Sequence, residues 1–217
     1  MNIEQARFNM IEQQIRPWNV LDQDILELLH VVKREQFVPA VYANLTFADI
    51  EIPLPGGEAM LVPKYEARIL QEVGPRKHES VLEIGTGSGY MAALLAHRAG
   101  KVTTVEINPE TKKLAEQNLA KAGVHNVSVE LGNGAEGWPQ GAPYDLIVVS
   151  GALEVLPEAL LAQVKVGGRI GAIVGQAPAM AFNVITRTGE NSWNTVHIFE
   201  TDVKYLTGAP TPSHFQF

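Results

Sequence analysis

The sequence contains no cysteine. Disulfide bonds, thiolate-bound metals and cysteine nucleophiles are therefore excluded, and cysteine usage says nothing about the redox compartment. Basic residues are also scarce, because 17 lysines and arginines stand against 24 acidic residues and the formal net charge is -7. This charge has the wrong sign for a protein that neutralises phosphate backbones, so we expect no nucleic-acid partner.

Long hydrophobic runs are missing as well. No stretch approaches the length of a membrane span, so we expect no membrane partner. Residues 1–16 carry charged and amide side chains throughout and lack the basic start, apolar run and cleavage site of a signal peptide. These features predict a cytoplasmic location. The six histidines include no pair at metal-ligand spacing, and we assign no metal site.

The chain has 217 residues, 46% of them apolar, which is enough to bury the core of one domain. We expect a single domain over residues 1–217, in which residues 1–63 form a helical and loop cap and residues 64–217 form an α/β core. In the cap, Asp22 can begin a helix over residues 24–32. The prolines and glycines of residues 46–63 predict an ordered loop.

From residue 80 onward, apolar strands alternate with helices. The expected strands are residues 80–85, 101–107, 126–131, 145–150 and 169–175, and the expected helices are residues 90–99, 109–122 and 156–164. Strands separated by helices predict a doubly wound, mostly parallel sheet that is covered on both faces. Residues 183–189 and 193–200 flank GENS like the arms of a hairpin, which predicts an antiparallel edge.

A glycine-rich turn joins the first of these strands to its helix. Its glycines are Gly85, Gly87 and Gly89, and Tyr90 stands where a dinucleotide-binding turn carries its third glycine. The spacing is therefore GxGxG. Such a turn suits any ligand that approaches backbone amides at a helix N-terminus, so the turn alone does not identify the ligand.

Two acidic residues narrow the choice of ligand. Glu83 lies inside the strand, two residues before Gly85, where a carboxylate would face the pyrophosphate of a dinucleotide at a cost. S-adenosylmethionine carries an ammonium and a sulfonium group, and its charge matches this acid. Glu106, at the end of the next strand, is placed to accept hydrogen bonds from both ribose hydroxyls, although NAD sites use the same device.

Asn133 follows the third strand and lies between Gly132 and Gly134. Its amide can meet the adenine of the ligand, although this sequence also suits an ordinary surface turn. Two other functions stay open on the residues alone. One is an NAD-dependent dehydrogenase, against which Glu83 and Tyr90 weigh, and the other is a non-catalytic regulatory or interaction protein that binds S-adenosylmethionine.

Three segments resemble protein-L-isoaspartate O-methyltransferases: LEIGTGSGYMAALLA, GNGAEGWPQGAPYDLIVVSGALEVLPEALLAQVKVGGR and RPW...REQFVPAVYANLTFAD. The resemblance covers nearly the whole chain. It implies a class I methyltransferase fold, S-adenosylmethionine as donor, S-adenosylhomocysteine as product and a helical N-terminal region that helps to roof the site. Together with the residues above, it predicts a cofactor site made of Glu83, Gly85, Thr86, Gly87, Ser88, Gly89, Glu106, Ile107, Asn133 and Gly134.

The chain departs from the family in its substrate loop. The family reads approximately LPIGxGQTISxP where this chain has IPLPGGEAMLVP, so the family's threonine and serine fall on Ala59 and Leu61. A carboxylate needs no strong base to attack a methylsulfonium group, but it must be oriented, and hydroxyl groups would do this. We therefore expect weak or undetectable methylation of isoaspartyl peptides, with Glu58 and Ser150 as alternative positioning residues.

The acceptor class stays open at this stage. It is a protein or peptide, or a small acceptor that carries a carboxylate or an apolar group, and the oligomeric state is not predicted.

Overall fold

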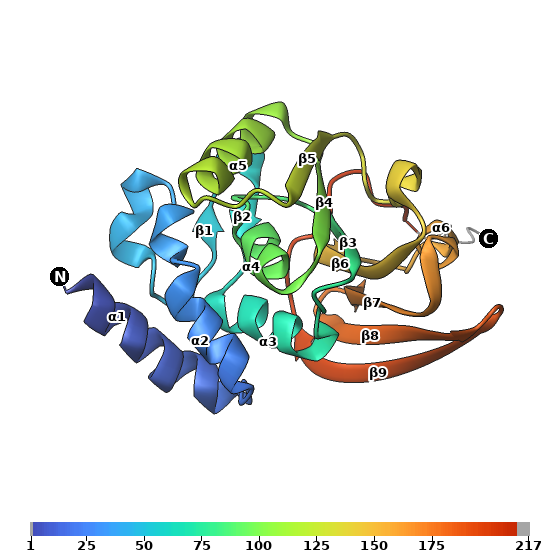
Figure 1. Cartoon of the computed structure of the whole chain (residues 1–217), viewed down its shortest axis with the longest axis horizontal. Helices are drawn as coiled ribbons and strands as arrows, with labels where there is room; N and C mark the ends of the chain where they lie inside the picture. The colour runs from blue at the N-terminus through green and yellow to red at the C-terminus, as the bar shows by residue number, and fades with distance from the viewer. Residues whose placement is uncertain (1, 212–217) are drawn as a thin grey trace.

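The computed structural model describes residues 2–211, and its centre is a seven-stranded sheet (Figure 1). The strand order is β5-β4-β3-β6-β7-β8-β9. The strands are β3 (Ser80–Ile84), β4 (Lys101–Glu106), β5 (Val127–Leu131), β6 (Tyr144–Leu153), β7 (Val164–Gln176), β8 (Ala179–Gly189) and β9 (Ser192–Thr201). Strands β3 to β7 pair in parallel, and β8 and β9 pair antiparallel at one edge. The doubly wound sheet and its edge hairpin are confirmed.

The strand order reverses direction at β3, which pairs with both β4 and β6. In an open α/β sheet, ligands bind outside the carboxyl ends of the strands at such a switch point. The turn that follows β3 is the glycine-rich turn, so the fold places it where the sheet offers a ligand site.

Helices cover both faces of the sheet. They are α3 (Pro63–Val73), α4 (Tyr90–Arg98), α5 (Pro109–Lys121) and the short α6 (Glu158–Ala162). Val81 packs with α3 and α4 in one buried cluster, whereas Leu82 and Ile84 pack with α6 in the other. Successive side chains of a strand point to opposite faces. Glu83 therefore lies on the same face as Val81, toward α3 and α4.

Helix α3 is not among the elements predicted from the sequence. Pro63 occupies its first turn, where the fixed φ of proline suits a helix start, and Gly74 ends it in the left-handed conformation. The helix also buries Ala67, Ile69 and Leu70. Helix α6 is shorter than expected and β7 begins five residues earlier than expected, at Val164.

The N-terminal region is helical, as expected. It contains α1 (Ile3–Met10), a π-helical turn (Ile11–Ile15), a 3-10 turn (Arg16–Trp18) and α2 (Gln23–Val31). The side chain of Asp22 accepts a hydrogen bond from Asp24 N at 2.9 Å and caps α2. Both helices lie at the left of the view, at the end of the molecule away from α6 (Figure 1). Among residues 2–211, none of the helices combines the length and the apolar character that a membrane crossing needs.

The expected loop over residues 46–63 contains a small hairpin of β1 (Ile52–Pro53) and β2 (Ala59–Met60). A 3-10 turn at Pro55–Gly57 joins the two strands. The hydroxyl of Thr111, in the first turn of α5, donates a hydrogen bond to the carbonyl of Pro55 at 3.1 Å. This contact fixes the hairpin turn against the end of the sheet that carries the glycine-rich turn.

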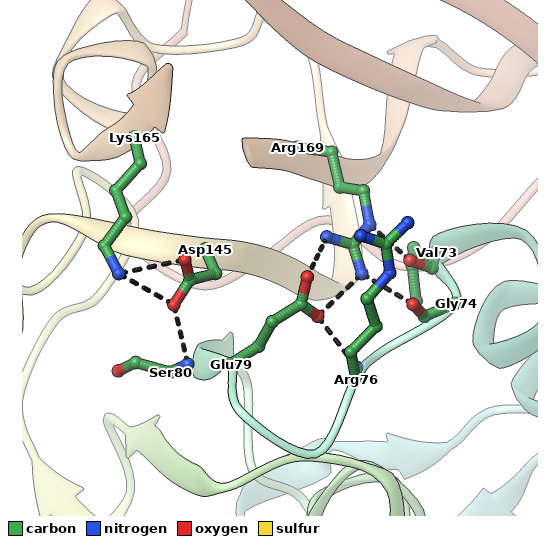
Figure 2. Close-up of polar contacts among 8 residues, drawn as sticks. All are labelled: Val73, Gly74, Arg76, Glu79, Ser80, Asp145, Lys165 and Arg169. Carbon is green, nitrogen blue, oxygen red and sulfur yellow. Dashed lines mark hydrogen bonds and ion pairs between the residues drawn. The ribbon is translucent and has the colours of Figure 1, made fainter. Parts of the chain in front are cut away.

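An ion-pair network joins β3, β6 and β7 at their amino ends (Figure 2). Arg169 of β7 makes two hydrogen bonds of 2.9 Å to the carboxylate of Glu79, which precedes β3, and also donates to the carbonyls of Val73 and Gly74. Asp145 of β6 accepts from Ser80 N at 2.8 Å and from Lys165. These contacts hold the strands together at their amino ends. The carboxyl ends, on the opposite side of the sheet, are free to bind a ligand.

Candidate functional site

A pocket opens at the carboxyl ends of β3, β4, β5 and β6. The space between its lining residues, including the part that is open to solvent, is about 730 Å³. Its lining includes nine of the ten predicted cofactor-binding residues, namely Glu83, Gly85, Thr86, Gly87, Ser88, Glu106, Ile107, Asn133 and Gly134. The fold therefore brings together residues that span 52 positions of the sequence, from 83 to 134.

The tenth residue, Gly89, has a different place. It caps the N-terminus of α4 in the left-handed conformation, with φ of 85°. A Cβ atom at this position would lie 3.2 Å from Leu119 Cγ and 3.4 Å from Ala115 Cβ, both in α5. Gly89 thus allows α4 and α5 to pack closely.

Gly85 and Gly87 form the floor of the pocket, and both have positive φ values, of 89° and 53°. A Cβ atom at Gly85 would lie 3.2 Å from Leu206 and 3.4 Å from the carbonyl oxygen of Ser150. A side chain here would therefore be strained and crowded. The backbone of this turn is exposed to the pocket because neither position carries a side chain.

Glu83 is completely buried, so its side chain is not an acid that water solvates at the end of a strand. Its carboxylate accepts hydrogen bonds from the hydroxyls of Thr104 at 2.7 Å and Ser150 at 2.9 Å. Burial raises the pKa of Glu83 to about 8, although both hydroxyls favour the ionised form. A cation that enters the pocket would shift this carboxyl group to its ionised form.

Glu106 is nearly buried, with an exposed fraction of 4%. Its carboxylate accepts from Gly87 N and from Asn108 N, each at 3.0 Å. Two backbone amides thus fix the side chain at the end of β4 and leave its remaining lone pairs for a ligand. Glu106 also couples the glycine-rich turn to the N-terminus of α5.

Asn133 and Ile107 lie at the outer part of the pocket, and both are exposed. Asn133 Oδ1 accepts from Ala135 N at 2.9 Å, and its Nδ2 donates to the carbonyl of Gly208 at 3.2 Å. The side chain therefore links the turn after β5 to the C-terminal segment. An apolar side chain and a glycine-flanked turn thus lie at the same end of the pocket.

Sequence reasoning missed Glu66 because it missed helix α3. Glu66 lines the pocket and pairs with the buried guanidinium of Arg34. Burial raises the pKa of Glu66 to about 7, and the charge of Arg34 opposes this rise. Arg34 also donates to the carbonyls of Thr46 and Leu61, so it connects α3 to the substrate-side loop.

Sequence reasoning also missed that Leu206 and Thr207 contribute to the pocket. Leu206 and Thr207 line the pocket, and Leu206 occupies space beside Gly85 and Gly151 where a Cβ atom would collide. Backbone hydrogen bonds to Ala152 hold the segment on the end of β6. The glycine at position 151 is the one signal that could have indicated close packing here.

Glu58, Ala59, Met60 and Leu61 form one wall of the pocket. Leu61 is buried and Ala59 is half-buried, and none of the four side chains carries a hydroxyl group. Ser150 also lines the pocket, but its hydroxyl donates to Glu83 and orients that carboxylate. Within residues 2–211, no group of three or more histidine, aspartate or glutamate side chains is arranged to hold a metal ion.

A sequence model described as "Protein-L-isoaspartate(D-aspartate) O-methyltransferase (PCMT)" matches residues 5–208. The chain belongs to this family. The protein-L-isoaspartate O-methyltransferase of Gloeobacter violaceus is 41% identical over 180 residues, which cover 82% of this chain and 88% of the relative. That of Rhodopseudomonas palustris is 37% identical over 201 residues, 92% of each chain.

Solved structures of the family share the fold. One protein-L-isoaspartate O-methyltransferase structure has a TM-score of 0.77 and 25% sequence identity, and the match covers 95% of this chain and 66% of that one. A beta-aspartate methyltransferase (PCMT) from Plasmodium falciparum, in complex with S-adenosyl-L-homocysteine, has a TM-score of 0.78, 16% identity and coverage of 95% and 99%. The class I methyltransferase fold expected from the sequence is confirmed.

Membership in the protein-L-isoaspartate O-methyltransferase family decides between the functions left open by the residues. The family uses S-adenosylmethionine, so the expected cofactor is confirmed, and the chain is an S-adenosylmethionine-dependent methyltransferase rather than a non-catalytic protein. The assignment of individual cofactor-binding residues stays a prediction.

Replacement of Glu106 by alanine tests this assignment. We expect Glu106→Ala to weaken donor binding by about 1–3 kcal/mol, because the ribose hydroxyls lose a charged acceptor and the amides of Gly87 and Asn108 lose theirs. Titration calorimetry with S-adenosylhomocysteine measures the effect. Glu110→Ala is the control, because Glu110 lies four residues further on, in the first turn of α5, and does not line the pocket. An unchanged affinity in Glu106→Ala would remove Glu106 from the donor site.

Proposed function

We propose that this chain transfers a methyl group from S-adenosylmethionine, bound in the pocket at the carboxyl ends of β3 to β6, to a carboxylate of a protein or peptide acceptor. One observation carries the proposal: the buried carboxyl group of Glu83 lies beside a glycine turn whose backbone faces the same pocket. An acid next to the backbone of a glycine turn is complementary to a ligand end that carries both an ammonium and a carboxylate group.

The residues of the pocket fit the donor along its length. Glu83 and Glu66 would bind the cationic methionyl end, and the turn from Gly85 to Ser88 would bind its carboxylate. Glu106 would accept from the ribose, and the adenine would lie between Ile107 and the turn around Asn133. When bound, S-adenosylmethionine supplies an electrophilic methyl group.

The acceptor side is assigned from the family and from the pocket. The relatives are named for protein-L-isoaspartate, which supports a protein or peptide that carries an aspartyl-type carboxylate. Such a nucleophile needs no proton removed, so the chain has to exclude water and to orient the carboxylate. The apolar wall of Ala59 and Leu61 performs the first task.

We also propose that residues 1–63 act as a cap on a donor-binding core of residues 64–217, in one domain, and that the protein is cytoplasmic.

Donor binding and its pH dependence test the proposed function. Glu83 has a raised pKa of about 8, so at pH 7 it is largely protonated in the free protein and must lose its proton to bind an ammonium group. We therefore expect binding to release protons at pH 7, and to tighten as the pH rises from 6 to 8. Calorimetry in buffers of different ionisation enthalpy measures the released protons.

The matched variant is Glu83→Gln, which keeps the shape and loses the titration. We expect its affinity to fall and its proton release to decrease, while Glu66, whose pKa burial raises to about 7, still titrates in the pocket. The proposal fails if the wild type binds NAD and not S-adenosylmethionine, or if no methyl group reaches any peptide or protein acceptor. The residue assignment alone fails if Glu83→Gln releases protons as the wild type does.

A further inference from the structure

Two segments that are distant in sequence meet at the mouth of the pocket. Glu58, from the hairpin loop, accepts hydrogen bonds from Lys204 Nζ at 2.9 Å and from Thr207 Oγ1 at 3.2 Å. Lys204 Nζ also donates to the carbonyl of Gly57 at 2.9 Å. Because Glu58 and Thr207 both line the pocket, this cluster lies at its edge.

The pocket itself is acidic. Its lining includes four carboxyl groups, those of Glu58, Glu66, Glu83 and Glu106, and none of its lining residues is a lysine, arginine or histidine. A carboxylate acceptor therefore enters an environment that repels it unless a cation compensates. Arg34 is not placed to do so, because it is fully buried and its guanidinium is bound to Glu66 and to two backbone carbonyls.

Lys204 has the properties that such a cation needs. Its side chain is half-exposed, and its amine lies at hydrogen-bond distance from a carboxylate of the lining. An ammonium group has three N–H donors, and two of them are used by Gly57 and Glu58. The third is available to an acceptor. Because an exposed ion pair contributes little to stability, Lys204 can share its charge between two carboxylates at small cost.

We propose that Lys204 binds the carboxylate of the acceptor and determines the preference for anionic acceptors, with Glu58 as its competing partner in the free enzyme. The proposal rests on the proposed function, since it concerns the acceptor of the same reaction. In this proposal Lys204 contributes to the affinity of the enzyme for the acceptor. The final orientation of the carboxylate against the donor remains poor, because the wall of Ala59 and Leu61 has no hydroxyl group.

The two residues are expected to act in opposite directions. Lys204→Met removes the cation and should weaken acceptor binding about tenfold or more, as the loss of a charge-assisted hydrogen bond does. Lys204→Arg should retain binding within about threefold. Glu58→Gln removes the competing negative charge and should tighten binding about threefold. If the pair of Lys204 and Glu58 only held the two segments together, acceptor affinity would instead fall in both Lys204→Met and Glu58→Gln.

The probe is an isoaspartyl hexapeptide with blocked termini, in which the isoaspartyl group is the one carboxylate. The same peptide with a carboxamide at this position is the comparison. Binding is measured by fluorescence anisotropy on the full chain saturated with S-adenosylhomocysteine. Lys165→Met is the control for the loss of a half-exposed positive charge, because Lys165 pairs with Asp145 at the opposite end of the sheet.

The supporting result is a wild type that prefers the carboxylate peptide, loses this preference in Lys204→Met and keeps it in Lys165→Met. The proposal is overturned if the wild type binds both peptides equally, if it binds neither, or if Lys204→Met behaves as the wild type does. S-adenosylhomocysteine affinity and methyl transfer to unfractionated protein acceptors are measured in parallel. Their absence would contradict the proposed function, whereas their presence with an unaffected Lys204→Met contradicts only the role of Lys204.

Discussion

The wild-type protein is expected to methylate isoaspartyl peptides with a kcat/KM well below about 10⁴ M⁻¹s⁻¹, the lower end of the usual enzyme range. The reason is the wall formed by Ala59 and Leu61, which lines the pocket and has no hydroxyl to orient a carboxylate. The loss falls on the geometry of attack and leaves the donor site intact. Transfer of a radioactive methyl group to the peptide measures the rate.

The double variant Ala59→Thr with Leu61→Ser restores the two hydroxyl groups. We expect kcat/KM to rise on the order of 10²-fold, because a nucleophile that is displaced by a small distance loses about this factor. The matched control is Ala59→Val with Leu61→Ala, which changes the size of both side chains in the same way and adds no hydroxyl. A gain in both double variants would show that space, and not hydrogen bonding, limits the reaction.

Two results would contradict the expectation. A wild type with kcat/KM near or above about 10⁴ M⁻¹s⁻¹ would show that other groups position the carboxylate, with Glu58 and Ser150 as the first candidates. An inactive double variant that still binds the donor would point to a different acceptor. Leu61 is buried, so the thermal stability of each variant is measured first to confirm that it is folded.

The second large effect is expected at the opposite end of the sheet. Arg169→Met should destabilise the protein by about 3 kcal/mol, because it leaves the buried carboxylate of Glu79 without its partner and frees the carbonyls of Val73 and Gly74. For a domain of this size the expected fall in Tm is roughly 6–12 °C. Thermal unfolding followed by circular dichroism measures it.

Lys165→Met is again the control, since its pair with Asp145 is half-exposed and worth about 0–1 kcal/mol. A comparable fall in Tm in both variants would show that burial of the Arg169 pair is not what matters. Donor affinity is expected to stay unchanged in both variants, because neither residue lines the pocket.

The contribution of this pair also depends on pH. Burial opposes the ionised form of Glu79, but the hydrogen bonds and charge of Arg169 outweigh it and hold the pKa of Glu79 below its ordinary value of 4.5. A group with a lowered pKa in the folded state stabilises the protein above its ordinary pKa and ceases to do so as the pH falls. The difference between wild type and Arg169→Met should therefore be largest near neutral pH and shrink below pH 4.5.

The sequence predicted the sheet well, and nine of the ten residues that it predicted for the donor site line one pocket, because both depend on local pattern. Glu83, the glycine turn and Glu106 lie within 24 residues of each other, from 83 to 106, at the ends of two adjacent strands. Period-two apolar runs and glycine spacing are visible in a single sequence. The family resemblance identified the substrate loop, which has no periodic pattern of its own.

The parts that were missed depend on contacts between distant segments. Glu66 required helix α3, whose charged residues obscure its apolar face, and its partner Arg34 lies 32 residues away. Leu206 and Thr207 reach the pocket through backbone pairing with Ala152. No local pattern indicates that a segment after the last strand returns to the first glycine turn, because the signal is a packing match between Leu206 and two glycines.

This return of the C-terminal segment has a consequence for truncated forms of the protein. The last strand of the sheet ends at Thr201, so a chain that stops there keeps every sheet strand but lacks Leu206 and Thr207, which line the pocket. Such a chain also loses the apolar contacts that Val203 and Leu206 make with the core. It is expected to bind the donor poorly even where its sheet forms.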